Sequence, residues 1–386
     1  MSSREARGSI LSRSVILITA ALLFTATQLN AASFSVYELR GRVSVSDPTG
    51  GTFSPGLQDL IESGTTVRTS RDSSISFTGN SYHYRVYAYS LVQIQDEPVL
   101  VYGKLSKSKS GEYIGLQFYY LPTPAQGRTM KVVVRSTEND INVESSLLRE
   151  DNRNRSLTMY RVGEGRYQAL TGFDCEAPAV RYKLSIRATR EGNGHTQVIY
   201  PFYLRKTSFS TGKVRLSPAK EALFEPSERK SREVDRLKEV LSTSSERKLW
   251  ESAFNYPVEN PEIISAFGKK RTYYLGGKLI RVQHHRGIDY RALRGTPVYA
   301  PNHGVVVLTA ERITTGNTVV IDHGHGVFSL FFHLDSILVG EGNSVTRGDK
   351  IAEAGSTGIT AGPHLHWGLL VDGIYVDPQD WIQRSF

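Results

Sequence analysis

Residues 318–332, TVVIDHGHGVFSLFF, contain the pattern that decides the fold of this chain. Two apolar runs, Thr318 to Ile321 and Val327 to Phe332, flank a segment that holds Gly324 and Gly326. β-Branched and aromatic residues favour strands, and glycine permits the tight turns between them. We therefore expect two neighbouring antiparallel strands here.

The same pattern continues on both sides of this stretch. Further apolar runs lie at 298–300, 304–308 and 365–370, and Gly-rich turns such as 340–343 separate them. This spacing predicts that residues 251–386 form a compact antiparallel β-sheet domain with almost no helix.

The chain as a whole is predicted to be mainly β and multi-domain, because 386 residues exceed one ordinary core. Short strand-like runs between turn residues predict a β-rich accessory domain over 33–110, which resembles the small β domain of FecR-like proteins. Apolar runs at 130–134, 182–188 and 197–204 predict a β-sandwich over 111–216. The segment Tyr167–Asp174 resembles part of the immunoglobulin-like domains that precede peptidase domains in exported cell-wall enzymes.

Residues 217–250 differ in character and are expected to form a helical linker. Ser227 suits a helix N-cap, and Val234, Leu237 and Leu241 fall at helical spacing. One or two helices here would connect the β-rich accessory regions to the C-terminal sheet domain.

Residues 1–32 have the pattern of a signal peptide. A positively charged start precedes an apolar run from Val15 to Leu29, which is shorter than the roughly 20 residues of a membrane span. The small residues Ala31 and Ala32 follow, as suits cleavage. The pattern predicts export, either to a periplasm or into the medium, and an uncleaved membrane anchor is the alternative.

Composition limits the classes of function. Hydrophobic residues make up 39% and charged residues 22%, as in folded globular proteins. Cys175 is the single cysteine, so it forms no internal disulfide and is expected to be a buried small hydrophobe. The net charge of +9 suits an anionic polymer such as the cell wall, although solubility alone would also explain it. Export argues against nucleic acid as a partner.

Histidine placement points to the chemistry. Of the ten histidines, eight lie between His284 and His366. The informative ones fall in three short motifs, namely His285-Arg286-Gly287-Ile288-Asp289, Phe332-His333-Leu334 and Gly362-Pro363-His364-Leu365-His366.

On extended strands, residues two or four apart share a face. His285 and Asp289 would then project together, as would His364 and His366, and two such strands side by side would gather imidazoles and a carboxylate. Zinc prefers such N and O donors, and three protein ligands plus a water are typical of a catalytic zinc site. Each motif alone is weak, because a lone histidine is more often a hydrogen-bonded structural residue.

At this point the sequence resembles a known family, the lysostaphin-type (LytM-like) zinc metallopeptidases, which hydrolyse peptidoglycan peptides. The resemblance covers about 120 residues, and none of the motif positions departs from the family pattern. The matching segments beyond the three histidine motifs are Gly295-Thr296-Pro297-Val298-Tyr299-Ala300-Pro301, Gly304-Val305-Val306, Gly316-Asn317-Thr318-Val319-Val320-Ile321-Asp322-His323-Gly324 and Gly355-Ser356-Thr357-Gly358.

The resemblance implies one zinc ion per chain with His285, Asp289 and His366 as its ligands. It also implies that His333 and His364 are catalytic histidines that do not bind the metal. Which of the two would take the proton from the attacking water stays open. The short Tyr273–Gly277 stretch is expected either to border the substrate groove or merely to connect strands.

The resulting hypothesis is a zinc endopeptidase that cuts the peptide cross-links of bacterial peptidoglycan, with stem peptides as its partners. A second hypothesis is a cell-wall-binding regulator without activity, which would activate a partner hydrolase. The complete set of ligand residues argues against this regulator. A regulatory envelope protein is a further partner to test for, and a peptidase of other Gly-rich proteins is a third reading.

Overall fold

The computed structural model describes residues 33–386 except for short gaps at 41, 56–58, 63, 72, 80–81, 88–89, 95–97, 104, 110–115, 122–123, 137–139, 191–194 and 219–224. The expected signal peptide lies outside the described residues. The protein is mainly β, as predicted, and the described strands form several antiparallel sheets. Neither helix in the described part of the chain is long and apolar enough to cross a membrane.

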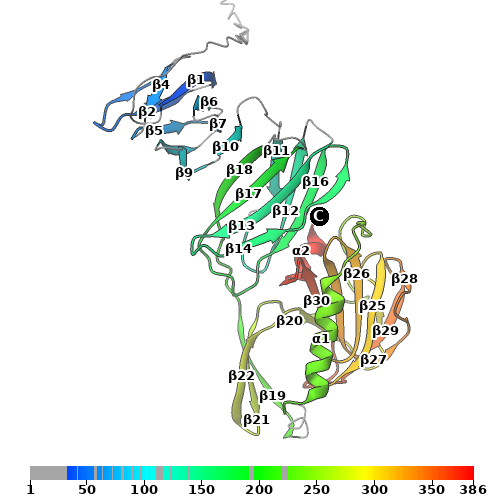
Figure 1. The fold of residues 1–386 in the computed structure, drawn as a ribbon. Coiled ribbons are helices and arrows are strands. Elements are labelled where there is room, and N and C mark those ends of the chain that lie inside the picture. The colour runs from blue at the N-terminus through cyan, green and yellow to red at the C-terminus, as the bar shows by residue number, and fades with distance from the viewer. Residues whose placement is uncertain are drawn as a thin grey trace, which may run out of the picture.

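The N-terminal lobe, blue in Figure 1, is built from strands β1 to β10. Its core contains a cluster of three aromatic rings, those of Phe34, Phe77 and Tyr84, with centroids 5.5–5.7 Å apart. The strands are β1 Ser33–Arg40, β2 Val43–Ser46, β3 Thr52–Phe53, β4 Leu60–Glu62, β5 Thr66–Thr69, β6 Ser74–Gly79, β7 Tyr82–Val86, β8 Leu91–Ile94, β9 Pro98–Tyr102 and β10 Leu105–Lys109.

The middle lobe contains two sheets, one of four strands in the order β11-β12-β16-β15. The other sheet continues into the N-terminal lobe, because β10 pairs with β18 and completes a nine-stranded sheet. The strands are β11 Leu116–Leu121, β12 Thr129–Ser136, β13 Asn142–Arg149, β14 Asn154–Leu157, β15 Tyr160–Gly163, β16 Arg166–Gly172, β17 Arg181–Thr189 and β18 His195–Tyr203.

The C-terminal lobe is an antiparallel sheet in the order β20-β23-β30-β27-β26-β25-β28, with β24, β29 and β31 attached to it. Its only helix among the described residues is the short α2, Pro378–Gln383, which agrees with the prediction of almost no helix. The strands are β20 Ile263–Ser265, β23 Ile288–Tyr290, β24 Pro297–Tyr299, β25 Gly304–Arg312, β26 Gly316–Gly324, β27 Val327–Ile337, β28 Ser344–Val345, β29 Lys350–Ala354, β30 Leu365–Val371 and β31 Ile374–Val376.

The central strands of this sheet are buried on both faces. Along β30, Trp367 and Leu369 enter the main core, whereas Leu370 joins a smaller cluster on the other face. Helix α1, Glu228–Ser242, covers that second cluster, and its Leu237, Val240 and Leu241 pack against it (Figure 1). Apolar side chains therefore hold this sheet from both sides, which makes it a rigid platform.

Among its described residues, the linker contains one helix, within the expectation of one or two. Ser227 caps α1 as predicted, since its side chain accepts a hydrogen bond from the Lys230 amide. Val234, predicted to share the apolar stripe, is instead 44% exposed, and residues after Thr243 leave the helix. Of the residues predicted from helical spacing to be buried, Leu237 and Leu241 pack against the sheet and Val234 does not.

A second small sheet lies beside the C-terminal platform. Strand β19, Thr211–Leu216, pairs in parallel with β21, Lys270–Leu275, which forms a hairpin with β22, Lys278–His284 (Figure 1). Gly276 and Gly277 both have positive φ, as a two-residue hairpin turn requires. Residues 211–216 were expected to belong to the immunoglobulin-like sandwich at 111–216. They instead pair with the hairpin next to the C-terminal sheet.

The middle and C-terminal lobes are docked through a polar and aromatic interface around α2. The Trp381 indole is fully buried and donates a hydrogen bond to Thr129 Oγ1 at 2.8 Å. Buried Asp380 accepts from Arg128 Nη1 at 3.3 Å, and the Asp377 amide donates to the Gly127 carbonyl at 2.7 Å. These paired groups fix the orientation of one lobe on the other.

Candidate metal centre

The centre begins with two strands that lie side by side, as the sequence predicts. Strand β23 pairs with β30 so that Asp289 stands opposite His366. Gly287, between His285 and Asp289, leaves room for the His366 ring, since a Cβ there would lie 2.6 Å from two of its ring atoms. The His-Arg-Gly-Ile-Asp motif therefore requires glycine for steric reasons.

His285 completes a three-residue cluster. Its Nε2 atom lies 2.9 Å from Asp289 Oδ1 and 3.0 Å from His366 Nδ1, and His366 Nδ1 lies 2.8 Å from the same carboxylate oxygen. His285 precedes β23 rather than continuing it, so it reaches the cluster from a turn and not from an extended strand. Its Nδ1 atom donates to the Ala266 carbonyl at 3.0 Å, which leaves the Nε2 lone pair facing the cluster.

Burial tunes these groups for metal binding. All three residues are less than 10% exposed. Burial lowers the pKa of His366 to about 4, so its ring is neutral near pH 7. Burial opposes ionisation of Asp289, but the adjacent His285 and His366 rings outweigh it and hold the pKa of that carboxyl well below its usual range. A carboxylate and two imidazoles converge, which is a fitting donor set for a divalent metal.

Arg271 is a member of the site that the sequence analysis did not identify. Its guanidinium forms an ion pair with Asp289 Oδ2, the carboxylate oxygen that faces away from the two imidazoles. The arginine reaches Asp289 from β21, outside the histidine motifs. Only the position of the β21–β22 hairpin next to Asp289 would have revealed this contact.

A bulge in β27 turns His333 toward a cleft that Asp289 and His364 also line. Its φ of 63° is left-handed, and the pairing of β27 with β26 shifts at this position. Such bulges redirect side chains beside functional sites. His333 Nδ1 donates to the Thr357 carbonyl at 2.8 Å, so Nε2 is left to accept a proton. Burial, together with the nearby His364 and His366, lowers the pKa of His333 to about 3.

His364 lies next to His333, with ring centroids 5.0 Å apart. Its Nδ1 atom donates to the Gly362 carbonyl at 2.8 Å, and its Nε2 lies 3.7 Å from Asp289 Oδ1. The structure therefore brings all five predicted site residues together, three in the cluster and two beside it.

The cleft has a basic wall that the sequence analysis missed. Asp289, His333 and His364 line it from the sheet domain, and Gly212, Lys213, Val214 and Leu216 of β19 line it from the other side. Lys269 also lines it, and neither this side chain nor Lys213 has an ion pair with another described residue. Tyr273 borders the same cleft, so the Tyr273–Gly277 stretch both turns the hairpin and contributes to the groove.

A hydrogen-bond chain supports the floor of the cluster. His323, which is fully buried, donates from Nδ1 to the His303 carbonyl at 2.7 Å and accepts from Ser329 Oγ at 2.9 Å. Ser329 in turn accepts from the indole of Trp367, the neighbour of His366, at 3.2 Å. The burial of His323 lowers its pKa to about 4. His323 is therefore structural.

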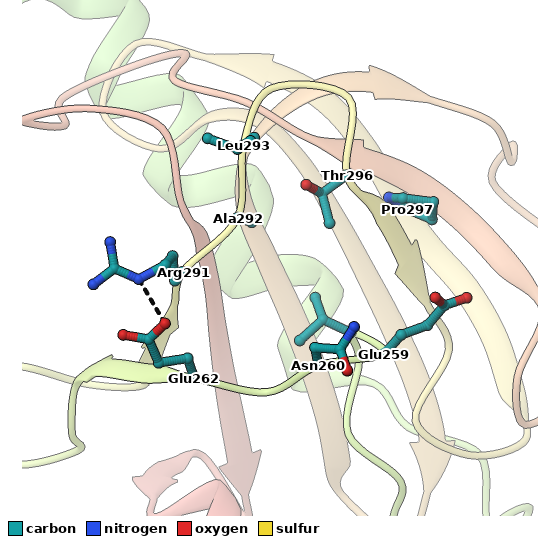
Figure 2. A pocket seen from close by; sticks show the side chains of 9 residues that line it. Glu259, Asn260, Glu262, Arg291, Ala292, Leu293, Thr296 and Pro297 are labelled. Carbon is teal, nitrogen blue, oxygen red and sulfur yellow. Dashed lines mark hydrogen bonds and ion pairs between the residues drawn. The ribbon is translucent and has the colours of Figure 1, made fainter.

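A separate hollow on the C-terminal lobe lacks such chemistry. Figure 2 shows Arg291 and Glu262 pointing toward each other at one end, and the two are joined at 2.7 Å. Glu259, Asn260 and Thr296 line the remainder, and no histidine or cysteine belongs to its lining. In this hollow, Arg291 and Glu262 neutralise each other's charge. The cleft around Asp289 contains the histidines and is therefore the candidate functional site.

The antiparallel platform with a His-Asp-His cluster and two adjacent histidines defines a metallopeptidase type of domain. Residues 283–378 match the sequence model of Peptidase family M23. The C-terminal region of this chain is therefore an M23 peptidase domain, which agrees with the lysostaphin-type resemblance.

Curated relatives and a solved structure are similar to about a third of this chain. The peptidoglycan DD-endopeptidase ShyB of Vibrio cholerae is 42% identical over 130 residues, which cover 33% of this chain and 30% of the relative. ShyA of the same organism is 42% identical over 118 residues, which cover 31% and 27%. The catalytic domain of lysostaphin from Staphylococcus simulans is 28% identical with a TM-score of 0.28, covering 32% of this chain and 93% of that one. The alignments thus span less than a third of either curated relative's own length.

Proposed function

We propose that this protein is a zinc-dependent endopeptidase that hydrolyses peptide cross-links of bacterial peptidoglycan. The observation that carries the proposal is the convergence of His285, Asp289 and His366 on one point of the cleft in an M23 domain. The names of the curated relatives support the substrate, since ShyA and ShyB are peptidoglycan DD-endopeptidases.

His285 Nε2, Asp289 Oδ1 and His366 Nδ1 are proposed to hold the zinc ion. When bound, zinc supplies a Lewis acid for the scissile carbonyl and lowers the pKa of a coordinated water. The hydrogen bond from His285 Nδ1 to the Ala266 carbonyl would keep Nε2 available as the ligand atom. Arg271 holds the second oxygen of Asp289 and thereby orients the carboxylate.

His333 and His364 are proposed to move protons. Each ring uses Nδ1 to donate to a backbone carbonyl, which leaves Nε2 free at the cleft. Because burial keeps His333 neutral, its Nε2 can accept the proton of an attacking water. His364, less buried and closer to Asp289, would then donate to the developing oxyanion or to the leaving amine.

The basic wall fits a peptide substrate that carries carboxylates. Stem peptides of peptidoglycan bear free carboxylates, and Lys213 and Lys269 offer ammonium groups along the cleft. Strand β19 would thus contribute to substrate binding although it lies outside the residues that match the family.

We further propose the domain plan predicted above, with two β accessory domains at 33–110 and 111–216 and the catalytic residues within 251–386. The exception is 211–216, which pair with the hairpin beside the C-terminal sheet. Because peptidoglycan lies outside the cytoplasm, we also propose that the protein acts there. We propose a periplasmic location after removal of residues 1–32.

The test is digestion of purified peptidoglycan by the exported form of the chain, with and without a zinc chelator. We expect new amino and carboxyl termini within cross-link peptides, identified by mass spectrometry, and their loss with chelator. Intact cross-links after incubation with the zinc-loaded protein would overturn the proposal in favour of a binding regulator.

A further inference from the structure

The turn after β16 places a second set of metal-type donors beside the first. Cys175 and Glu176 lie in this turn of the middle lobe, and His284 ends β22 of the neighbouring lobe. The Cys175 sulfur, a Glu176 carboxylate oxygen and a His284 nitrogen all lie within 4.8 Å of one another. We propose that Cys175, Glu176 and His284 form a second zinc site, which joins the middle lobe to the M23 domain.

The spacing of the donors suits a tetrahedral ion. Donors about 2.0–2.3 Å from zinc stand roughly 3.3–3.7 Å from one another. Glu176 Oε1 already lies 3.2 Å from His284 Nδ1. The Glu176 side chain is exposed and free to rotate, so a small adjustment brings the three donors around one ion. A water would take the fourth position.

The turn itself is preorganised. The Glu176 amide donates to Asp174 Oδ1 at 2.8 Å, and the Ala177 amide donates to the Asp174 carbonyl at 3.0 Å. His284 is held at the other side by its pairing with Lys270. Because both backbones are fixed, metal binding needs only side-chain movement, which limits the entropy it costs.

Charge around the cluster also favours a dication. Asp174 and Glu176 are acidic, and their single basic neighbour among the described contacts is Arg286, 3.4 Å from Asp174 and 4.0 Å from Glu176. Ionisation of the thiol would leave two negative charges uncompensated, which zinc neutralises. Burial and the neighbouring Asp174 raise the pKa of the Cys175 thiol to about 12, so the free thiol stays protonated until a metal arrives.

The binding step is balanced within this set. The S–H bond of Cys175 breaks, the sulfur keeps the electron pair and donates it to zinc, and the proton leaves to water. Glu176 binds through a carboxylate oxygen, and His284 binds through the lone pair of a ring nitrogen. A site with sulfur, oxygen and nitrogen donors suits zinc better than the hard cations calcium or magnesium.

Cobalt substitution of the full-length, metal-free protein tests the site without any reference to hydrolysis. Since Cys175 is the single cysteine, a near-ultraviolet thiolate-to-cobalt absorption band can arise only there. We expect one metal equivalent beyond the catalytic one, together with this band. His366→Ala should lose the catalytic equivalent and keep the band, whereas Cys175→Ser should lose the band and keep the catalytic equivalent.

Two further measurements cover the case in which Cys175→Ser fails to fold. In the unmutated protein, zinc at about ten times its dissociation constant should slow alkylation of Cys175 about tenfold. Glu176→Gln should weaken cobalt binding at the thiolate about tenfold, and Glu164→Gln, an exposed change elsewhere on the same lobe, should leave it unchanged. Absence of the band together with unchanged alkylation in zinc would overturn the proposal, whatever the hydrolytic activity proves to be.

Discussion

His284 and His285 are adjacent in sequence, yet they face two different clusters. His285 turns toward Asp289, where strand pairing fixes Asp289 and His366, and hydrogen bonds to the carbonyls of residues 266 and 269 hold His285. His284 turns toward Glu176 of another lobe, where docking of the lobes sets the distance. An arginine contacts the carboxylate in each case, Arg271 at Asp289 and Arg286 at Glu176. The cluster around Asp289 therefore forms within the C-terminal lobe, whereas the cluster around Glu176 forms only where two lobes meet.

The largest expected effect comes from removing a donor within the sheet. His366→Ala should lower peptide hydrolysis roughly a thousandfold or more, since the proposed ligand set acts as a unit. Metal analysis should show loss of the catalytic zinc and retention of the ion at Cys175. Near-normal activity in a zinc-free variant would exclude His366 as a ligand. Loss of both ions would instead show that the two clusters are one coupled site.

The neighbouring histidines should separate chemistry from metal binding. His333→Ala and His364→Ala should each lower kcat by about 10²–10⁴-fold, the usual range for a general acid or base. Zinc content should remain at the level of the unmutated protein, because neither ring is proposed to bind the ion. A proportional loss of zinc in either variant would move that histidine into the ligand set.

The supporting hydrogen-bond chain should reveal itself in the pH dependence of stability. The pKa of His323 falls to about 4 in the folded protein, below its ordinary 6.5. The unfolded state therefore binds more protons between these values, so this stabilisation is full above pH 6.5 and is lost as pH falls toward 4. The difference is on the order of 3 kcal/mol.

Denaturant unfolding of His323→Gln across this pH range checks the effect. The free energy of unfolding of the variant should fall less steeply on acidification than that of the unmutated protein. Parallel pH profiles for the two proteins would mean that His323 does not support the floor of the centre in this way.

Arg271 should have a smaller effect, on metal affinity rather than on catalysis at saturating zinc. Residues that orient ligands typically contribute 10–100-fold to affinity, so Arg271→Gln should raise the zinc dissociation constant by about that factor. A competition titration with a chromogenic chelator measures it. Arg271→Lys should recover part of the affinity, and an unaltered dissociation constant in the glutamine variant would contradict the role.

The smallest effect concerns the basic wall. Lys213→Glu should raise KM for cross-linked stem peptides several-fold with little change in kcat, since an exposed charge contributes up to about 1 kcal/mol. Lys278→Glu, an equal change of charge on exposed β22 outside the cleft lining, is the matched control. Equal KM values for the two variants would remove Lys213 from substrate binding.

Much of the C-terminal sheet could be predicted from the sequence, because its strands are short apolar runs separated by glycine turns. The five candidate site residues could be chosen because their motifs recur in a family, and alternation on strands placed Asp289 beside His366. The left-handed bulge at His333 could not be foreseen, since neighbouring strands and not local residues impose it. It is this bulge that aims the ring into the cleft.

Contacts between distant segments escaped prediction for the same reason. The local sequence of 211–216 predicts a strand, but it does not predict which strand pairs with it. The parallel pairing with β21 depends on how the lobes are arranged. Arg271 and Cys175 lie outside any motif, so their roles follow only from the structure. Val234 shows the converse, because its helical spacing was correct and the sheet beneath the helix did not extend to it.

Zinc titration into the metal-free full-length protein, with an isolated cross-linked muropeptide dimer as substrate, tests the central claim most directly. The account predicts that conversion of the dimer to two monomers rises in proportion to occupancy of the His285–Asp289–His366 cluster and stops rising when that cluster is filled. Conversion by the metal-free protein, or an intact dimer when the cluster is full, would contradict it.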